Sequence, residues 1–245
     1  MPEVIYLFDV DGTLTDHRQP IREEFAGVFL DWVAVKTRTV YLVTGSDVSK
    51  TKEQIFPSFI DQCCGIFTCS GNVFYSKGNK IYEKAMIIPE GLVENLELYL
   101  DQSEWRQKQG NHIELRSGTI NFSTLGRNAS QNMREAYTKW DVINREREDI
   151  VAYLGELYPN LEVVIGGDIS VDIYSAGANK GQIIETLHER HGKDASIVFV
   201  GDRNKPGGND WPLAQRLEQM NNCQWYQVLG PEETRALIEY GELFI

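Results

Sequence analysis

The sequence has few cysteines and few basic residues, and it lacks long apolar runs. Its four cysteines are Cys63, Cys64, Cys69 and Cys223. Their spacing suits neither a zinc site nor a disulfide framework, which predicts reduced thiols and a cytoplasmic location. No apolar stretch approaches the roughly 18 residues of a membrane span, and the first residues do not resemble a secretory signal. Membrane insertion and secretion are therefore not expected.

The charge balance is acidic. The 245 residues include 24 lysines and arginines against 36 aspartates and glutamates, which gives a net charge of −12. Because nucleic acids and anionic membranes attract basic surfaces, neither is an expected partner. A phosphorylated substrate is compatible with this balance, since a single site can be locally positive. At 42% hydrophobic residues, the chain can bury the core of one large domain or two small ones.

The two ends of the chain alternate strands with helices. Apolar runs predict strands at 4–8, 39–43, 65–68, 197–200 and 225–228. Helical patterns lie at 21–35, 50–55, 181–191 and 232–240. This alternation is typical of a parallel sheet covered by helices. Residues 1–81 and 179–245 are therefore expected to form one core domain.

The middle of the chain has a different pattern. It predicts helices at 90–100 and 145–157, and hairpins at 112–123 and 161–173 whose turns are rich in glycine. This order indicates an antiparallel sheet with helices on one face, inserted as a cap domain over 82–178. The predicted fold class is α/β, a Rossmann-like parallel-sheet core with an inserted α+β cap domain.

The segment LFDVDGTLT at 7–15 places two aspartates directly after a buried strand. Side chains at positions i and i+2 of a strand share a face, so Asp9 and Asp11 project together if the extended geometry persists. Their charges would then repel unless a proton or a cation lay between them. The alternative is that this Asp-x-Asp-Gly segment is only a polar turn.

Further polar groups follow other predicted strands or open a helix. Thr44-Gly45-Ser46 follows the strand at 39–43, Lys180 precedes the helix at 181–191, and Asp202 follows the strand at 197–200. Active sites of open α/β sheets lie at the carboxyl ends of the strands, so these groups are expected to meet. Each group alone also has an interpretation without a catalytic role, as a turn, a surface lysine or a polar loop.

Together these groups suit phosphoryl transfer. Carboxylates bind Mg²⁺, a hard cation that commonly also contacts substrate phosphate. A lysine and a hydroxyl can hold the remaining phosphate oxygens. One aspartate can act as a nucleophile and form an aspartyl-phosphate, and a second can donate and accept the proton.

These residues resemble the motifs of the haloacid-dehalogenase-type phosphotransferases. DVDGT at 9–13 is similar to the first motif, Thr44 or Ser46 to the second, Lys180 to the third, and Asp202 with Asp210 to the fourth. A closer resemblance, over nearly the whole chain, is to eukaryotic-type phosphomannomutases. It rests on GSDVSKTKEQ at 45–54, IELRSGTINFSTLGR at 113–127, REREDIV at 145–151, GGDISVDIYSAGANK at 166–180 and GDRNKPGGND at 201–210.

The resemblance implies a role for each matching residue. Asp9 would be the phosphorylated nucleophile and Asp11 the general acid/base, and the catalytic set would be completed by Thr44, Ser46 and Lys180. Mg²⁺ would be held by Asp9, the Asp11 backbone carbonyl and Asp202, with support from Asn209 and Asp210. The substrate would be bound by Arg18, Arg116, Arg127, Arg134, Ser170 and Asp172.

The resemblance also implies a function and partners. The expected enzyme is a Mg²⁺-dependent phosphomannomutase of mannose metabolism and GDP-mannose biosynthesis, which interconverts mannose 6-phosphate and mannose 1-phosphate through an aspartyl-phosphate. Its expected partners are small-molecule hexose phosphates, hexose 1,6-bisphosphate as activator and intermediate, and a second copy bound through the cap. Glucose phosphates stay open as substrates, because nothing in the sequence settles the configuration of the 2-hydroxyl group. The alternatives are a sugar-phosphate phosphatase on the same fold and an inert binding protein.

The residues of the cap agree with this interpretation. In GDISVDI at 167–173, Ile169, Val171 and Ile173 fall on one face of a strand, and Ser170 and Asp172 fall on the other. Arg116 similarly falls on the face opposite Ile113 and Leu115. A polar face with guanidinium groups suits a lid over a sugar phosphate. The alternative is an ordinary solvated sheet face with scattered arginines.

The chain departs from the family pattern in three places. The family's S-P-I-G-R is STLGR at 123–127, and its G-W-D-K is GANK at 177–180. The segment WPLAQRLEQ at 211–219 lacks the acidic residues expected for a second, structural cation site. These changes are expected to affect substrate preference and stability rather than the class of reaction.

Overall fold

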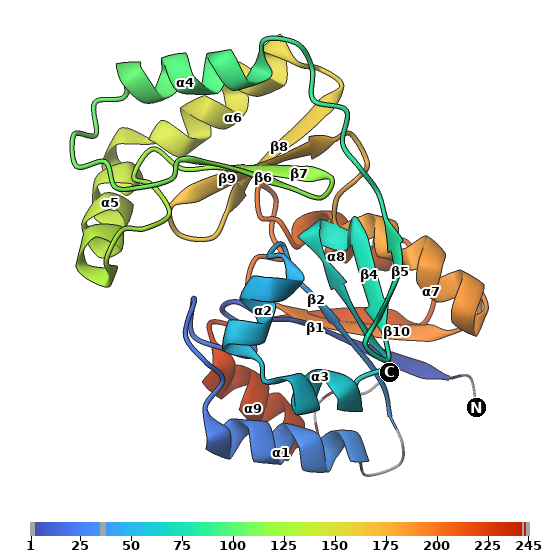
Figure 1. Ribbon diagram of the computed structural model, residues 1–245. Coiled ribbons are helices and arrows are strands. Elements are labelled where there is room, and N and C mark those ends of the chain that lie inside the picture. Colours follow the sequence, from blue (N-terminus) through green and yellow to red (C-terminus); the bar gives the residue numbers. More distant parts are fainter. Residues whose placement is uncertain (1–2, 35–37, 242, 244–245) are drawn as a thin grey trace. The chain divides into compact units, whose positions relative to one another are not determined.

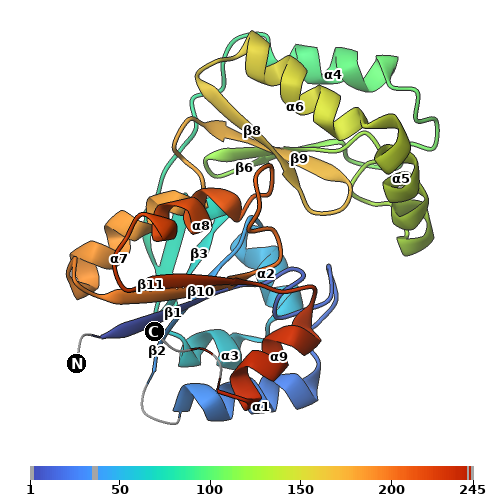
Figure 2. The ribbon, with the colours of Figure 1, turned by 180° about the vertical axis from the view of Figure 1, so that it is seen from behind.

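The computed structural model describes residues 3–34, 38–241 and 243, and these residues belong to two compact units (Figures 1 and 2). Unit 1 combines Met1–Glu83 with Ala178–Ile245, and unit 2 is Lys84–Gly177. Unit 1 contains a mostly parallel sheet and unit 2 a separate antiparallel sheet, so the predicted fold class is confirmed. Within the described ranges, no helix has the length and apolar character that crossing a membrane would need.

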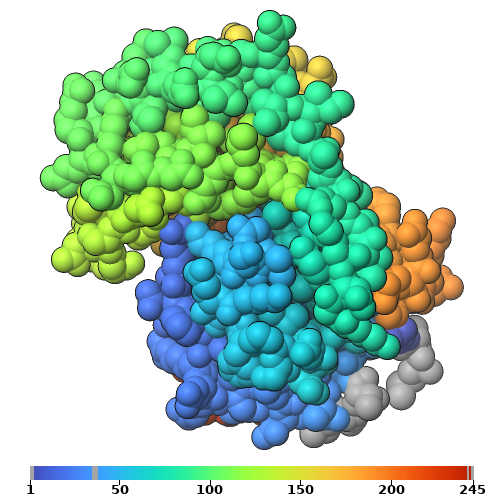
Figure 3. All heavy atoms as spheres, in the orientation of Figure 1, coloured from blue at the N-terminus to red at the C-terminus, as the bar shows by residue number. Residues whose placement is uncertain are grey.

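The described strands of unit 1 form one seven-stranded sheet. Its parallel part has β1 at the centre, in the order β11 (Cys223–Gln227), β10 (Ser196–Gly201), β1 (Val4–Asp9), β2 (Thr39–Val43) and β3 (Gly65–Thr68). An antiparallel hairpin continues the sheet beyond β3 through β4 (Val73–Ser76) and β5 (Asn79–Glu83). Most side chains of β5 are exposed, and this edge of the sheet is visible at the surface in Figure 3.

Helices cover both faces of this sheet (Figures 1 and 2). One face packs on α1 (Glu23–Ala34), α3 (Pro57–Gln62) and α9 (Pro231–Glu239). The other packs on α7 (Ile183–His191) and α8 (Trp211–Glu218). Side chains of the central strand β1 point alternately to the two faces. Phe8 packs in the core under α1, α3 and α9, and Leu7 packs in the core under α7 and α8. The predicted first helix extended to Val35, which lies outside the described residues.

Several elements were not predicted from the sequence. They are the β4–β5 hairpin, α3, α5 (Gln131–Asn144) and α8. Helix α5 buries only Tyr137 and Asp141, so it has little apolar periodicity. Helix α8 starts at a Trp-Pro pair directly after a glycine-rich loop. The sequence at this point has the pattern of a loop, so the start of the helix was not recognised. Helix α2 (Val48–Gln54) was predicted, and its N-terminus is capped by the Asp47 side chain.

Unit 2 is fully described, and its four strands are ordered β6 (Ile113–Arg116), β7 (Thr119–Phe122), β9 (Ser170–Ser175) and β8 (Leu161–Gly166). One face of this sheet packs on α4 (Leu92–Gln102) and α6 (Glu146–Leu157). Val171 and Ile173 point into that core, as predicted, whereas Ile169 packs in a separate cluster with Leu125 and Tyr137 because it precedes β9. The opposite face carries polar side chains.

Candidate active site

Three carboxylates and one lysine meet at the carboxyl ends of β1 and β10. Asp9 is the last residue of β1, Asp202 follows β10, and Asp210 precedes α8. Lys180 Nζ lies 2.5 Å from Asp9 Oδ1 and 2.5 Å from Asp210 Oδ1. Lys180, Asp9 and Asp210 are all buried. A single buried ammonium group therefore joins two carboxylates that come from opposite ends of the chain.

The electrostatics of this cluster are dominated by burial and crowding. Burial raises the pKa of Asp9 well above its usual value, and the charges of Asp210 and Asp202 raise it further, whereas Lys180 lowers it. Burial and Asp210 raise the pKa of Asp202 to about 6. Burial lowers the pKa of Lys180, but the charges of Asp210 and Asp9 outweigh it and leave this pKa above the usual value. The lysine is therefore charged at neutral pH.

This donor set fits a divalent cation. Among the described residues, Asp9, Asp202 and Asp210 each offer a carboxylate oxygen, and these oxygens lie within 4.8 Å of one another. A hard cation such as Mg²⁺ prefers oxygen ligands and often keeps several waters as well. Such a charge would relieve the repulsion that raises the pKa values of Asp9 and Asp202.

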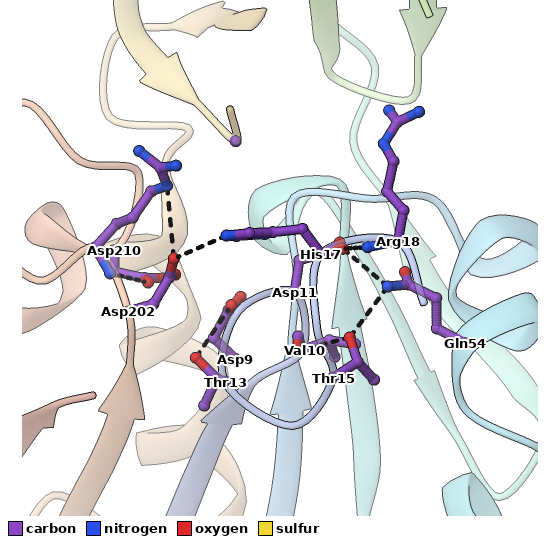
Figure 4. A network of polar contacts seen from close by, with 12 residues as sticks. Asp9, Val10, Asp11, Thr13, Thr15, His17, Arg18, Gln54, Asp202 and Asp210 are labelled. Carbon is purple, nitrogen blue, oxygen red and sulfur yellow. Dashed lines mark hydrogen bonds and ion pairs between the residues drawn. The ribbon is translucent and has the colours of Figure 1, made fainter. Parts of the chain in front are cut away.

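The expectation that Asp9 and Asp11 share a strand face is wrong, because β1 ends at Asp9. The chain then turns at Gly12, which has a φ of +82°. Figure 4 shows the two carboxylates with different partners. Asp9 accepts from Thr13 Oγ1 at 3.5 Å, and Asp11 Oδ1 accepts from Gln54 Nε2 at 2.8 Å. The two acids are thus held in separate networks, which suits different tasks.

Of the other predicted catalytic residues, Ser46 contacts Asp11 and Thr44 contacts Ser46. Ser46 Oγ donates to Asp11 Oδ2 at 3.4 Å, and the Ser46 backbone amide donates to Thr44 Oγ1 at 3.0 Å. The backbone amide of Arg18 donates to Asp11 Oδ1 at 3.0 Å. Arg18 has a φ of 60°, so the turn after β1 holds this residue in a left-handed conformation. Thr44 and Ser46 follow β2 and are both buried.

A strained turn supports the Thr44–Ser46 segment. Cys69 and Ser70, which follow β3, have φ values of 50° and 56° although neither is glycine. Their backbone amides donate to the carbonyls of Ser46 and Thr44, each at 2.9 Å. Strain of this kind persists only where surrounding contacts impose it. No pattern in the sequence predicted this support.

His17 is a residue of this site that sequence reasoning missed. Its Nε2 lies 3.7 Å from Asp202 Oδ2, and Figure 4 shows the ring pointing towards that carboxylate. Gly12 makes room for the pair, because a Cβ there would lie 2.6 Å from Asp202 Oδ2 and 2.7 Å from His17 Cε1. Asn209, a predicted metal-supporting residue, is half-buried in the turn before α8.

Two of the predicted binding residues of unit 2, Ser170 and Asp172, lie on the polar face of its sheet. Asn121, on β7, donates from Nδ2 to Ser170 Oγ at 3.1 Å and to Asp172 Oδ1 at 2.6 Å. Arg127 Nη1 donates to the same Ser170 hydroxyl at 3.3 Å. Asn121 is buried and was not predicted, although the alternation of β7 places it on this face.

The three predicted arginines of unit 2 have different surroundings. Arg116 forms an ion pair with Glu114, and Arg127 Nε lies 3.4 Å from the same Glu114 oxygen. Arg134, on α5, donates to the carbonyl oxygens of Arg127 at 2.7 Å and of Ala129 at 3.0 Å. Arg134 therefore fixes the backbone that carries Arg127.

Comparisons with known proteins agree with these features. A family model described as eukaryotic phosphomannomutase matches residues 29–243. A phosphomannomutase of Dendrobium officinale is 33% identical over 96% of this chain and 92% of the relative. Phosphomannomutase 1 of Dictyostelium discoideum is 33% identical over 100% of this chain and 98% of the relative. The C-terminal domain of trehalose-6-phosphate phosphatase from C. albicans has a TM-score of 0.66 at 15% identity, over 97% of this chain and 91% of that one, which shows a shared fold.

Proposed function

Because the chain belongs to the eukaryotic phosphomannomutase family, we propose that it is a Mg²⁺-dependent mutase that interconverts mannose 6-phosphate and mannose 1-phosphate. Glucose phosphates are further candidate substrates. Unit 1 would transfer the phosphoryl group, and the arginines of unit 2 would bind the phosphate at the other end of the hexose.

The proposed reaction starts with Asp9 as an aspartyl-phosphate. Its phosphoryl group passes to the 6-hydroxyl of mannose 1-phosphate, while Asp11 accepts the hydroxyl proton and the Asp9 carboxylate is regenerated. The resulting mannose 1,6-bisphosphate turns around. Asp9 then attacks the phosphorus at C1, the bond from that phosphorus to the sugar oxygen breaks, and Asp11 returns the proton to that oxygen. Mannose 6-phosphate leaves, and Asp9 is again phosphorylated.

Residues of this chain support each of these tasks. Lys180, with its charge fixed by two carboxylates, would neutralise the transferring phosphoryl group. The donors Gln54 and Ser46 would orient the Asp11 carboxylate for proton transfer. Bound Mg²⁺, held by Asp9, Asp202 and the Asp11 carbonyl with support from Asn209 and Asp210, would supply further positive charge for the phosphate oxygens.

The observation that carries the mutase proposal is the polar face of the unit 2 sheet. A phosphatase needs one phosphate site and admits water, whereas a mutase must hold phosphate at both ends of the sugar. Arg127 contacts Ser170 on this face, and Arg116 shares the Glu114 carboxylate with Arg127. Guanidinium groups suit a phosphate dianion, and hydroxyl and carboxylate groups suit sugar hydroxyls.

Arginine variants test this division of labour. Arg127→Met and Arg116→Met are expected to abolish conversion of mannose 1-phosphate, while hydrolysis of p-nitrophenyl phosphate by unit 1 continues. Arg145→Met is the matched control, because Arg145 is an exposed arginine of unit 2 that pairs with Glu148, three positions further along the chain. Loss of both activities together in the Arg116 and Arg127 variants would show that the two units do not divide the work in this way.

The family also supports two finer proposals. We expect a homodimer formed through unit 2, which exposes apolar side chains such as Leu115 on the edge strand β6 and Val142 and Ile143 near the end of α5. The cysteine usage supports a cytoplasmic location. Sedimentation of the purified chain would test the first expectation directly.

A further inference from the structure

The two arginines of unit 2 share one carboxylate. Glu114 and Arg116 stand two positions apart on β6, so their side chains leave the same face of the strand and form an ion pair. Arg127, in the loop after β7, places its Nε 3.4 Å from the same oxygen, Glu114 Oε2. The Arg116 and Arg127 side chains are only 6% and 10% exposed, and Glu114 is 26% exposed. Glu114 therefore lies between two nearly buried positive charges.

Two buried guanidinium groups this close would repel each other without a negative charge between them. Arginine cannot lose its proton to relieve that repulsion, and water screens poorly at such low exposure. A bound phosphate would supply the negative charge when substrate is present. In the absence of substrate, the Glu114 carboxylate pairs with both groups.

We propose that Glu114 is the resident counter-ion of the phosphate subsite formed by Arg116 and Arg127. It holds the arginine pair together while no substrate is bound, and it competes with the incoming phosphate for the same guanidinium groups. This inference rests on the proposed mutase function, and it adds a residue whose charge opposes substrate binding. The consequence is a lower affinity of this subsite for phosphate, which lets the hexose bisphosphate leave the subsite and turn around between the two transfers.

Other contacts hold Arg127 in place when the Glu114 charge is removed. Arg127 Nη1 donates to Ser170 Oγ at 3.3 Å, and the Arg127 backbone amide donates to Asn111 at 2.7 Å. Arg134 donates to the Arg127 carbonyl oxygen at 2.7 Å. A glutamine at position 114 also keeps the size and one acceptor oxygen of the glutamate. Glu114→Gln therefore changes the charge of the subsite far more than its geometry.

A counter-ion and a purely structural link predict opposite changes in affinity. If Glu114 only positioned the arginines, its removal would weaken phosphate binding. If it competes with phosphate, removal lowers the stability of the ligand-free protein and strengthens binding. The sign of the affinity change therefore separates the two roles, whatever happens to the ligand-free stability.

The experiment measures binding of glucose 1,6-bisphosphate and thermal unfolding for the full chain, Glu114→Gln and Glu156→Gln. Glu156 is an exposed residue of α6 in unit 2, so its variant removes the same charge away from the arginines. We expect Glu114→Gln to bind the bisphosphate about tenfold more tightly than the unmodified chain. Its ligand-free Tm should be lower, its ligand-induced rise in Tm larger, and its turnover slower. Glu156→Gln should match the unmodified chain.

A double variant, Glu114→Gln with Arg116→Met, tests whether the single variant loses stability through charge imbalance or through misfolding. It removes one charge of each sign, so its ligand-free Tm should recover towards that of the unmodified chain. Weaker or unchanged bisphosphate binding by Glu114→Gln would overturn the proposal, as would a double variant less stable than the single one. Failure of the unmodified chain to bind the bisphosphate would instead contradict the proposed mutase function, and the Tm of the double variant relative to the single one would still test whether Glu114 is the counter-ion of the arginine pair.

Discussion

Lys180 Nζ lies 2.5 Å from Asp9 Oδ1, although 171 positions separate the two residues in the sequence. All of unit 2 lies between them in the chain. The contact joins the first strand of unit 1 to the segment where the chain returns to it. The residue expected to carry the phosphoryl group is therefore paired with a lysine that the sequence supplies only after the inserted unit.

Removing this lysine should destabilise the fold. Lys180→Met leaves the carboxylates of Asp9 and Asp210 buried without their ammonium partner. Breaking a buried ion pair by removing one partner costs about 3–5 kcal/mol, and urea denaturation would measure the fall in the free energy of unfolding. Lys193→Met, at an exposed lysine, should leave it unchanged. A fall in the free energy of unfolding of under about 1 kcal/mol, typical of an exposed pair, would show that other groups stabilise the two carboxylates.

Replacing the expected nucleophile should separate activity from stability. Asp9→Asn is expected to lower phosphoryl transfer by at least about 10⁴-fold, as loss of a nucleophile does in other enzymes. Its Tm should not fall, because burial and the nearby Asp210 and Asp202 charges already disfavour the ionised Asp9 carboxyl. Lys180 keeps Asp210 as a partner. Substantial mutase activity in this variant, measured by phosphorus NMR, would identify a different nucleophile.

Crowding the turn after β1 should weaken cation binding. A Cβ at Gly12 would lie 2.6 Å from Asp202 Oδ2, so Gly12→Ala must displace that carboxylate. Gly78→Ala is a matched control, since Gly78 has a φ of +74° against +82° for Gly12 but has no atom within 4 Å of an added Cβ. Both variants carry backbone strain of about 1–2 kcal/mol. The rise in Tm that Mg²⁺ produces should shrink only in Gly12→Ala; an equal rise in both variants would contradict a cation site at Asp202.

Asn121 should act on substrate affinity through the residues it positions. Asn121→Ala removes the donor shared by Ser170 and Asp172. We expect KM for mannose 1-phosphate to rise about tenfold, the equivalent of one hydrogen bond to a charged group, with a smaller change in kcat. Asn144→Ala removes an exposed amide of α5 in the same unit and should leave KM unchanged. If kcat fell while KM stayed constant, Ser170 and Asp172 would not be binding the sugar.

The sequence predicted features that depend on local pattern. Apolar runs located the parallel strands, and alternation in β9 correctly placed Ser170 and Asp172 on one face and Val171 and Ile173 on the other. The pairing of Asp9 with Asp11 failed because β1 ends at Asp9 and the chain turns at Val10, whose carbonyl oxygen accepts from the amides of Thr13, Leu14 and Thr15. Helix α5 was missed because it buries few side chains.

Contacts between distant segments could not be predicted in the same way. His17 lies beside Asp202 only because β1 and β10 are neighbours in the sheet. No local pattern marks such a contact. The pairing of Glu114 with Arg116 could have been predicted, because the two residues lie two positions apart on a predicted strand and share its face. The contact of Arg127 with Glu114 could not be predicted, because Arg127 approaches from the loop after the next strand.

The central claim is that phosphate moves between the two ends of one hexose. Phosphorus NMR of the purified chain with Mg²⁺, mannose 1-phosphate and a trace of hexose 1,6-bisphosphate tests it most directly. We predict that the mannose 6-phosphate signal grows as the mannose 1-phosphate signal declines, with total sugar phosphate conserved. Release of inorganic phosphate alone would contradict the claim, because it would mean that water takes the phosphoryl group from Asp9 and that the protein is a sugar-phosphate phosphatase.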